Sequence, residues 1–152
     1  MTAVFAETLY WTAIFLPDDP WAKAAISVDL SEVRLVTTEE VIAEFLTGVS
    51  SYGEQTRLLA CKFVREILDD LDIEVVEQPH QSFLGGLALY ERRPDKQYSL
   101  TDCISMNLMK RKGISEVLTN DRHFSQEGKQ RRVLSVYALG GSVTTFMALS
   151  SQ

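Results

Sequence analysis

The chain has 152 residues, of which 45% are hydrophobic, and its formal net charge is −6 at pH 7. This length suits one domain with a single core and is short for two. The sequence contains no apolar run of the roughly 18 residues that a membrane span needs, and its first segment has no basic start. We therefore expect no membrane span, no secretion signal and a cytoplasmic protein.

The acidic average conceals an uneven distribution of charge. Residues 1–90 hold 15 acids and 5 Lys or Arg, whereas residues 91–152 hold 6 acids and 10 Lys or Arg. The late cations cluster at Arg92 to Lys96 and at Lys110 to Lys112. Cations at the end of a helix complement its dipole, which explains the second cluster; a phosphate-binding rim is the alternative.

Short β-prone runs alternate with helical patterns along the chain. In chain order, we expect a strand at 3–7 followed by a helix, a strand at 33–38, a helix at 39–49 and a helix between 54 and 71. A strand at 73–78, a helix at 81–91, a helix at 101–112, a strand at 116–119 and a last strand at 132–137 follow. Such alternation predicts an α/β fold with a mostly parallel central sheet and helices on both faces, a three-layer α/β/α arrangement. Residues 1–136 form a single domain in this interpretation, and residues 137–152 are an uncharged tail with no assigned role.

Two of the expected helices carry clear apolar patterns. The helix at 101–112 directs Ile104, Leu108 and Met109 inward and ends at Gly113. The helix between 54 and 71 has seven apolar residues that we assign to one stripe: Leu58, Leu59, Phe63, Val64, Ile67, Leu68 and Leu71.

Four acids lie at the carboxyl ends of expected strands or one turn beyond, where α/β sheets place reactive groups. Glu7 ends the first strand, Glu44 lies in the helix after the second, Asp102 opens its helix, and Asp121 follows the strand at 116–119. Four carboxylates brought together without a cation would repel one another. The set therefore predicts a hard divalent metal, Mg²⁺ or Mn²⁺.

Each acid also has a structural alternative when it is taken alone. Asp102 can be a first-turn acid that complements the helix dipole, with Ser99 or Thr101 as the cap, and Asp121 can be a turn residue. Glu40 lies three residues after Thr37, which is the spacing of a capping box. The two histidines, His80 and His123, have no metal-ligand spacing, and we place both on the surface.

The segments "AVFAET", "TTEEVIAEF", "YSLTDCISM" and "VLTNDRHFSQEG" together resemble the PIN-domain ribonucleases of the VapC toxin type, over roughly residues 3–134. The most specific part is "SLTDC" followed by "TNDRHF". The resemblance maps the acidic metal site of that family onto Glu7, Glu44, Asp102 and Asp121. One departure stands out, because the family usually has Asp before Thr or Ser where this chain has Glu7 and Thr8.

The resemblance implies an endoribonuclease that uses Mg²⁺ or Mn²⁺ to hydrolyse RNA phosphodiester bonds, with no covalent nucleophile. It also implies a homodimer and a cognate antitoxin as partners. Two alternatives stay open: a non-catalytic PIN-like domain that binds RNA or protein, and an enzyme acting on small phosphorylated substrates. The second of these lacks a glycine-rich phosphate loop.

Overall fold

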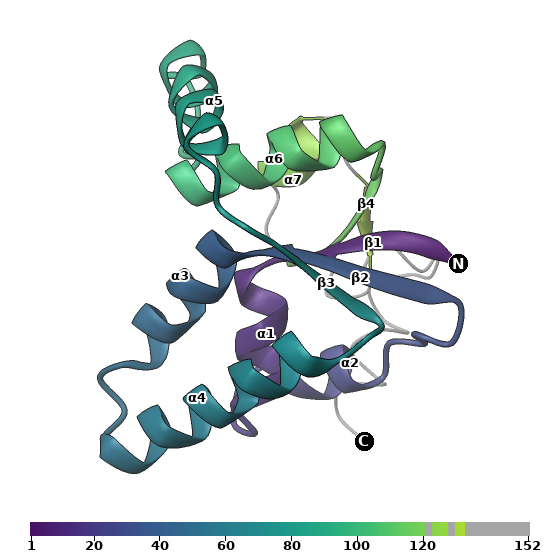
Figure 1. Cartoon of the computed structure of the whole chain (residues 1–152), viewed down its shortest axis with the longest axis vertical. Coiled ribbons are helices and arrows are strands. Elements are labelled where there is room, and N and C mark those ends of the chain that lie inside the picture. The colour runs from purple at the N-terminus through teal and green to yellow at the C-terminus, as the bar shows by residue number, and fades with distance from the viewer. Residues whose placement is uncertain (121–122, 128–129, 133–152) are drawn as a thin grey trace.

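The computed structural model describes residues 1–120, 123–127 and 130–132, in which strands and helices alternate (Figure 1). The strands are β1 (Thr2–Ala6), β2 (Val33–Thr38), β3 (Ile73–Val76), β4 (Glu116–Leu118) and β5 (Gln130–Arg132). The helices are α1 (Thr8–Phe15), α2 (Ala22–Ile26), α3 (Glu39–Val49), α4 (Glu54–Asp69), α5 (His80–Arg92), α6 (Leu100–Lys112) and α7 (His123–Gln126). The short helices α2 and α7 were not predicted, and the strand predicted at 132–137 and the tail lie beyond the described residues.

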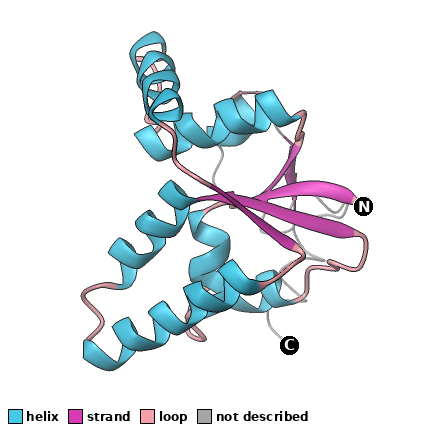
Figure 2. Cartoon of the chain, viewed as in Figure 1, coloured by secondary structure: helices cyan, strands magenta, loops and turns pink. Residues whose placement is uncertain are grey.

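The five strands form one sheet in the order β3-β2-β1-β4-β5, and every neighbouring pair is parallel. Helices α1 to α4 cover one face, and α5 to α7 cover the other (Figures 1 and 2). The predicted α/β/α arrangement is confirmed. Since all strands run the same way, their carboxyl ends meet at one edge of the sheet.

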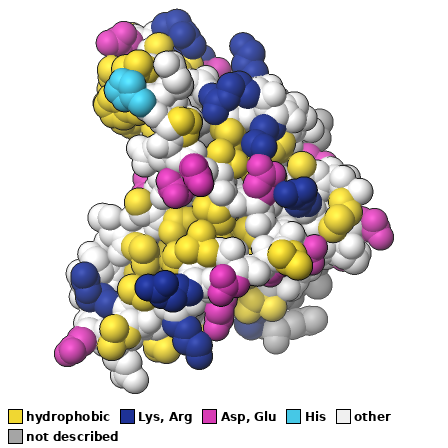
Figure 3. All heavy atoms as spheres, in the orientation of Figure 1, with side chains coloured by type: hydrophobic (Ala, Val, Ile, Leu, Met, Phe, Trp, Pro, Cys, Tyr) yellow, Lys and Arg dark blue, Asp and Glu magenta, His cyan; other side chains and the backbone are white. Residues whose placement is uncertain are grey.

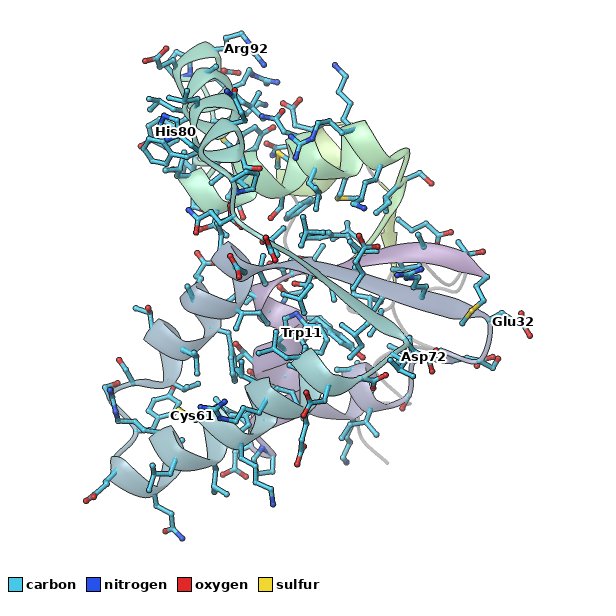
Figure 4. The ribbon with its side chains drawn as sticks, in the orientation of Figure 1. Trp11, Glu32, Cys61, Asp72, His80 and Arg92 are labelled. Carbon is cyan, nitrogen blue, oxygen red and sulfur yellow. The ribbon has the colours of Figure 1, made fainter. Side chains whose placement is uncertain are left out.

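The sheet is buried on both sides, which explains its apolar strands. Val4, Phe5 and Ala6 of the central strand β1 are fully buried. On the α1 face, the rings of Phe15, Phe45 and Phe63 pack against one another with centroids 5.4 to 5.7 Å apart. Trp11 points into the same layer (Figure 4). This core fixes α1 and α3 beside the sheet edge.

The seven-residue stripe predicted for α4 was wrong in part. Val64 and Ile67 are buried, whereas Leu58, Leu59, Leu68 and Leu71 are exposed. The helix turns about 100° per residue, so these leucines extend around most of its circumference, and Leu71 lies beyond its last residue. Only a narrow face of α4 contacts α3 and β3. Over the described residues, no helix is long and apolar enough to cross a membrane.

Helix α5 lies close against α6 because Gly86 has no side chain. A Cβ atom at Gly86 would lie 2.4 Å from Cγ1 of Ile104. We expect Gly86→Ala to lower the free energy of unfolding by about 1–3 kcal/mol, since the branched Ile104 side chain and α6 must shift. Urea denaturation measures this change.

The matched control is Gly48→Ala in α3, where a new Cβ would have no atom within 4 Å. This exposed helical site should gain about 0.5–1 kcal/mol, because alanine loses less backbone entropy on folding than glycine does. If Gly86→Ala is as stable as the native chain, the close packing of α5 on α6 is not what holds α6 in place.

Candidate functional site

The first acid of the site lies where β1 gives way to α1. Glu7 follows Ala6 directly and is the N-cap of α1. Its Oε1 accepts a hydrogen bond from the backbone N–H of Leu9 at 2.9 Å, and the residue is only 5% exposed. The carboxylate is therefore held at the carboxyl edge of the sheet and complements the positive end of α1.

Glu44 approaches this position from α3. The hydroxyl of Thr8, the residue after Glu7, donates a hydrogen bond to Oε2 of Glu44. Burial raises the pKa of the Glu44 carboxyl above its usual value, the Thr8 hydrogen bond opposes that rise, and the negative charge of Asp102 adds to it. Burial is thus the main cause of the raised pKa, and the smaller effect of Asp102 comes from a carboxylate on α6, which covers the other face of the sheet.

Asp102 is part of the capping box at the start of α6. Ser99 is the N-cap, its hydroxyl accepts the Asp102 N–H at 3.0 Å, and Oδ2 of Asp102 accepts the Ser99 N–H at 3.0 Å. The structural alternative with Ser99 as the cap is thus confirmed. A cap alone does not explain the electrostatic contact with Glu44, and Oδ1 accepts no hydrogen bond from any residue that the structure describes.

His123 was wrongly placed on the surface by the sequence analysis. Its Nδ1 lies 3.3 Å from Oδ2 of Asp102, and its side chain is largely buried. The ring also packs edge-on against Tyr98, with centroids 5.3 Å apart. The spacing rules for metal-binding histidines do not detect such a contact. The usable signal was its position, since it begins the short helix α7 two residues after Asp121.

The capping box predicted for Thr37 and Glu40 was also wrong. Thr38 is the N-cap of α3 and accepts the Val41 N–H at 3.1 Å, whereas the Thr37 hydroxyl donates to the Ala6 carbonyl at 2.8 Å. Glu40 is 8% exposed, and its Oε1 has no hydrogen-bond partner in the described part of the chain. It lies one turn before Glu44, on the same face of α3.

Comparison with known proteins decides the family. The PIN domain family matches residues 4–129, which is most of the chain. The chain belongs to the PIN domain family. Its structure is similar to VapC20 of Mycobacterium tuberculosis, described as a toxin that cleaves the sarcin-ricin loop, with a TM-score of 0.73 and 21% identity over 83% of this chain and 95% of that one. At this identity the likeness concerns the fold. A comparison with curated proteins gave no significant match.

Of the four predicted ligands of this PIN domain, the structure describes three. Asp121 lies outside the described residues, so its carboxylate is not placed. Among residues 1–120, 123–127 and 130–132, no group of three or more His, Cys, Asp or Glu side chains is arranged to hold a metal ion. In the described chain, the charge of Asp102 acts on Glu44, and Thr8, which follows Glu7 at the end of β1, donates a hydrogen bond to Glu44.

The donor chemistry nevertheless fits a hard divalent cation. Every candidate ligand is a carboxylate oxygen, which suits Mg²⁺ and Mn²⁺. The buried, unpartnered Oε1 of Glu40 lies one turn from Glu44, and a bound water or cation is what ordinarily satisfies such an atom. The arrangement can therefore concentrate negative charge at one edge of the sheet, where a cation offsets it.

The raised pKa of Glu44 predicts a pH dependence of stability in the metal-free PIN domain. A folded carboxyl with a raised pKa contributes stability that is fully present below its unfolded pKa, near 4.5, and is lost as pH rises through the folded pKa. Glu44→Gln keeps an acceptor for Thr8 but carries no charge. In EDTA at pH 7, we expect its Tm to exceed that of the native chain by about 2–4 °C for each kcal/mol gained in the free energy of unfolding. At pH 4 the two Tm values should be equal.

The control for this melt series is Glu66→Gln, which removes an exposed acid from α4. Its Tm should follow that of the native chain across the pH range. Equal Tm values for native and Glu44→Gln protein at pH 7 would show that the surroundings of Glu44 do not disfavour its charged form.

Proposed function

We propose that this PIN domain is a Mg²⁺- or Mn²⁺-dependent endoribonuclease, the toxin of a toxin–antitoxin pair, with Glu7, Glu44, Asp102 and Asp121 as its ligands. The observation that carries the proposal is the placement of three acids at the carboxyl edge of the sheet: Glu7 follows β1, Asp102 lies in the first turn of α6, and Glu44 of α3 accepts the hydroxyl of Thr8. Burial raises the pKa of Glu44 and the charge of Asp102 adds to that rise, which disfavours the charged carboxylate, and such groups are kept where a site requires them.

The residues around Glu44 and Asp102 each have a role in the proposed site. Glu44 and Asp102 present oxygens that the described residues leave without donors, and the Thr8 hydroxyl orients the Glu44 carboxylate. The Ser99 N–H and His123 orient the Asp102 carboxylate through its other oxygen. Glu44 and Asp102 would hold a divalent cation, which would supply a bound water of lowered pKa and would offset the negative charge of the phosphodiester and of the strand that carries it.

The family and the similar solved structure support a proposal about the partners. VapC20 is described as cleaving the sarcin-ricin loop, so a structured ribosomal RNA loop is the first substrate that we propose to test. A homodimer and a small protein antitoxin that covers the acidic site are the proposed assemblies.

A second candidate function is a PIN domain that binds RNA or protein without cutting. It is favoured by one observation: Oε1 of Glu7 is used as a helix cap, and Glu is one methylene longer than the usual Asp. A ligand displaced by about 1 Å can disturb an octahedral site.

Incubation of the purified chain with labelled RNA separates these two functions. Cleavage that requires Mg²⁺ or Mn²⁺ and stops on addition of EDTA supports the nuclease. Binding of RNA with no cleavage by either metal, across a sarcin-ricin loop oligonucleotide and several unstructured RNAs, supports the binding domain.

A further inference from the structure

A pocket of about 360 Å³ lies between the end of α5 and the start of α6. It is separate from the carboxylates described above. Its walls come from the last turn of α5 and from the loop that leads to the cap of α6. The lining residues are Tyr90, Glu91, Arg93, Pro94, Lys96 and Tyr98.

One wall of the pocket is fixed by internal contacts. The Arg93 guanidinium bonds the Asp95 carboxylate at 3.1 and 3.2 Å, pairs with Glu127 and lies 5.8 Å from the Tyr98 ring centre. The Tyr98 hydroxyl donates to the same Glu127 at 2.9 Å. Because two carboxylates already neutralise Arg93, its part is to hold the wall and not to attract an anion.

Two other lining groups remain available to a ligand. Tyr90 is 51% exposed, so about half of its surface is accessible to a ligand. The Lys96 ammonium is 3.9 Å from the Asp95 carboxylate, too far for a hydrogen bond. Figure 3 shows Lys and Arg side chains over the α5 and α6 half of the face in view, and others over the half that contains α4. The pocket thus combines a half-exposed ring with a cation that has donors to spare.

The wall that contains Tyr98 is connected to the acidic site by sequence and by side-chain contacts. Tyr98 precedes Ser99, the cap that bonds Asp102. The Tyr98 ring packs on His123, and His123 contacts the Asp102 carboxylate. One series of contacts therefore connects the pocket wall to the Asp102 carboxylate.

We propose that this pocket binds one unpaired nucleotide of an RNA strand, with its base against Tyr90 and its phosphate at Lys96, next to the phosphodiester at the acidic site. The inference rests on the proposed function and adds where the strand lies. Bases stack on exposed aromatic rings whatever their sequence, and a lysine ammonium pairs with phosphate. Glu91 in the lining repels a bare phosphate but accepts a hydrogen bond from an exocyclic amino group of a base.

The test is binding of a fluorescently labelled single-stranded RNA decamer in EDTA, measured by anisotropy, so that no cleavage occurs. Tyr90→Ala should weaken binding about tenfold, as loss of one stacked base does, and Tyr90→Phe should bind as the native chain does. Lys96→Ala should reduce the slope of log K against log salt by about 0.7, the value for one phosphate contact on a single strand.

Matched controls lie elsewhere on the surface. Tyr52→Ala removes an exposed tyrosine at the turn after α3, and Lys62→Ala removes an exposed lysine from α4. Neither should change affinity or salt slope. A series of decamers, each with one abasic site at a different position, locates the base that occupies the pocket. The native chain and Tyr90→Ala should bind with equal affinity to the decamer that lacks this base.

Three results would overturn the proposal: no RNA binding by the native chain, unchanged binding by both Tyr90→Ala and Lys96→Ala, or loss of binding that accompanies loss of a dimer in light scattering. The last would assign Tyr90 to contact with a second copy, since Phe83, Leu84 and Leu87 of α5 are also exposed. The assay contains no metal, so it tests the pocket independently of cleavage. If the pocket binds RNA but the chain cuts no RNA with either metal, the proposed nuclease activity is refuted and the proposed nucleotide pocket stands.

Discussion

Asp102→Asn is expected to reduce metal-dependent RNA cleavage by roughly a hundredfold or more, as loss of one preorganised electrostatic group at a reacting centre does. Its effect on folding should be small, because two contributions oppose each other. Asparagine retains an oxygen for the Ser99 N–H but loses the charge that favours a helix N-terminus, worth about 0.3–1 kcal/mol. Its neutral side chain also removes the repulsion on Glu44. Single-turnover cleavage with Mn²⁺ and urea denaturation in EDTA measure the two effects.

Ser99→Ala is the matched control, since it removes the cap hydroxyl and keeps the carboxylate. It should cost about 1 kcal/mol of stability, the usual value for an N-cap, and leave cleavage within a few-fold of native. If Asp102→Asn instead destabilises more than Ser99→Ala and still cleaves, Asp102 serves only as a helix cap.

The central part of the fold was predictable because each local signal agreed with its surroundings. The bounds of β2 and α3 were predicted correctly from the run Val33 to Thr38 and the helical pattern after it. Gly113, with φ of 67°, ends α6 where the sequence indicated. β2 is buried on both faces and α6 around most of its circumference, so the β-prone run and the glycine stop mark their bounds without knowledge of the packing partner.

Where prediction failed, the deciding contact joined segments far apart in the sequence. Nothing in the leucines of α4 tells which part of the helix circumference meets α3. His123 is 21 residues from Asp102, and no local pattern brings them together. The choice of Thr38 over Thr37 as the cap depended on the Ala6 carbonyl of β1, which takes the Thr37 hydroxyl.

Glu7 is the residue at which sequence, structure and family differ most. The family usually has Asp there, and the longer Glu side chain bends back so that Oε1 accepts the Leu9 N–H within the first turn of α1. Aspartate is among the preferred N-cap residues, so Glu7→Asp keeps the cap and shortens the reach of the carboxylate. Stability in EDTA should therefore hardly change in this variant, which separates an effect on the site from an effect on the fold.

We expect Glu7→Asp to raise Mg²⁺-dependent cleavage by roughly 10- to 100-fold, because a misplacement of about 1 Å can cost that much, and Glu7→Gln to remove it. Mn²⁺ should support native cleavage better than Mg²⁺, since Mg²⁺ demands the more regular octahedral geometry. Glu54→Asp, the same exchange at an exposed acid in the first turn of α4, should leave cleavage unchanged. If neither metal supports cleavage by native or Glu7→Asp protein on any RNA tested, the domain binds without cutting. A Glu for Asp exchange keeps the charge and both ligand oxygens, whereas a domain released from catalysis is free to lose the carboxylate, and this favours the nuclease.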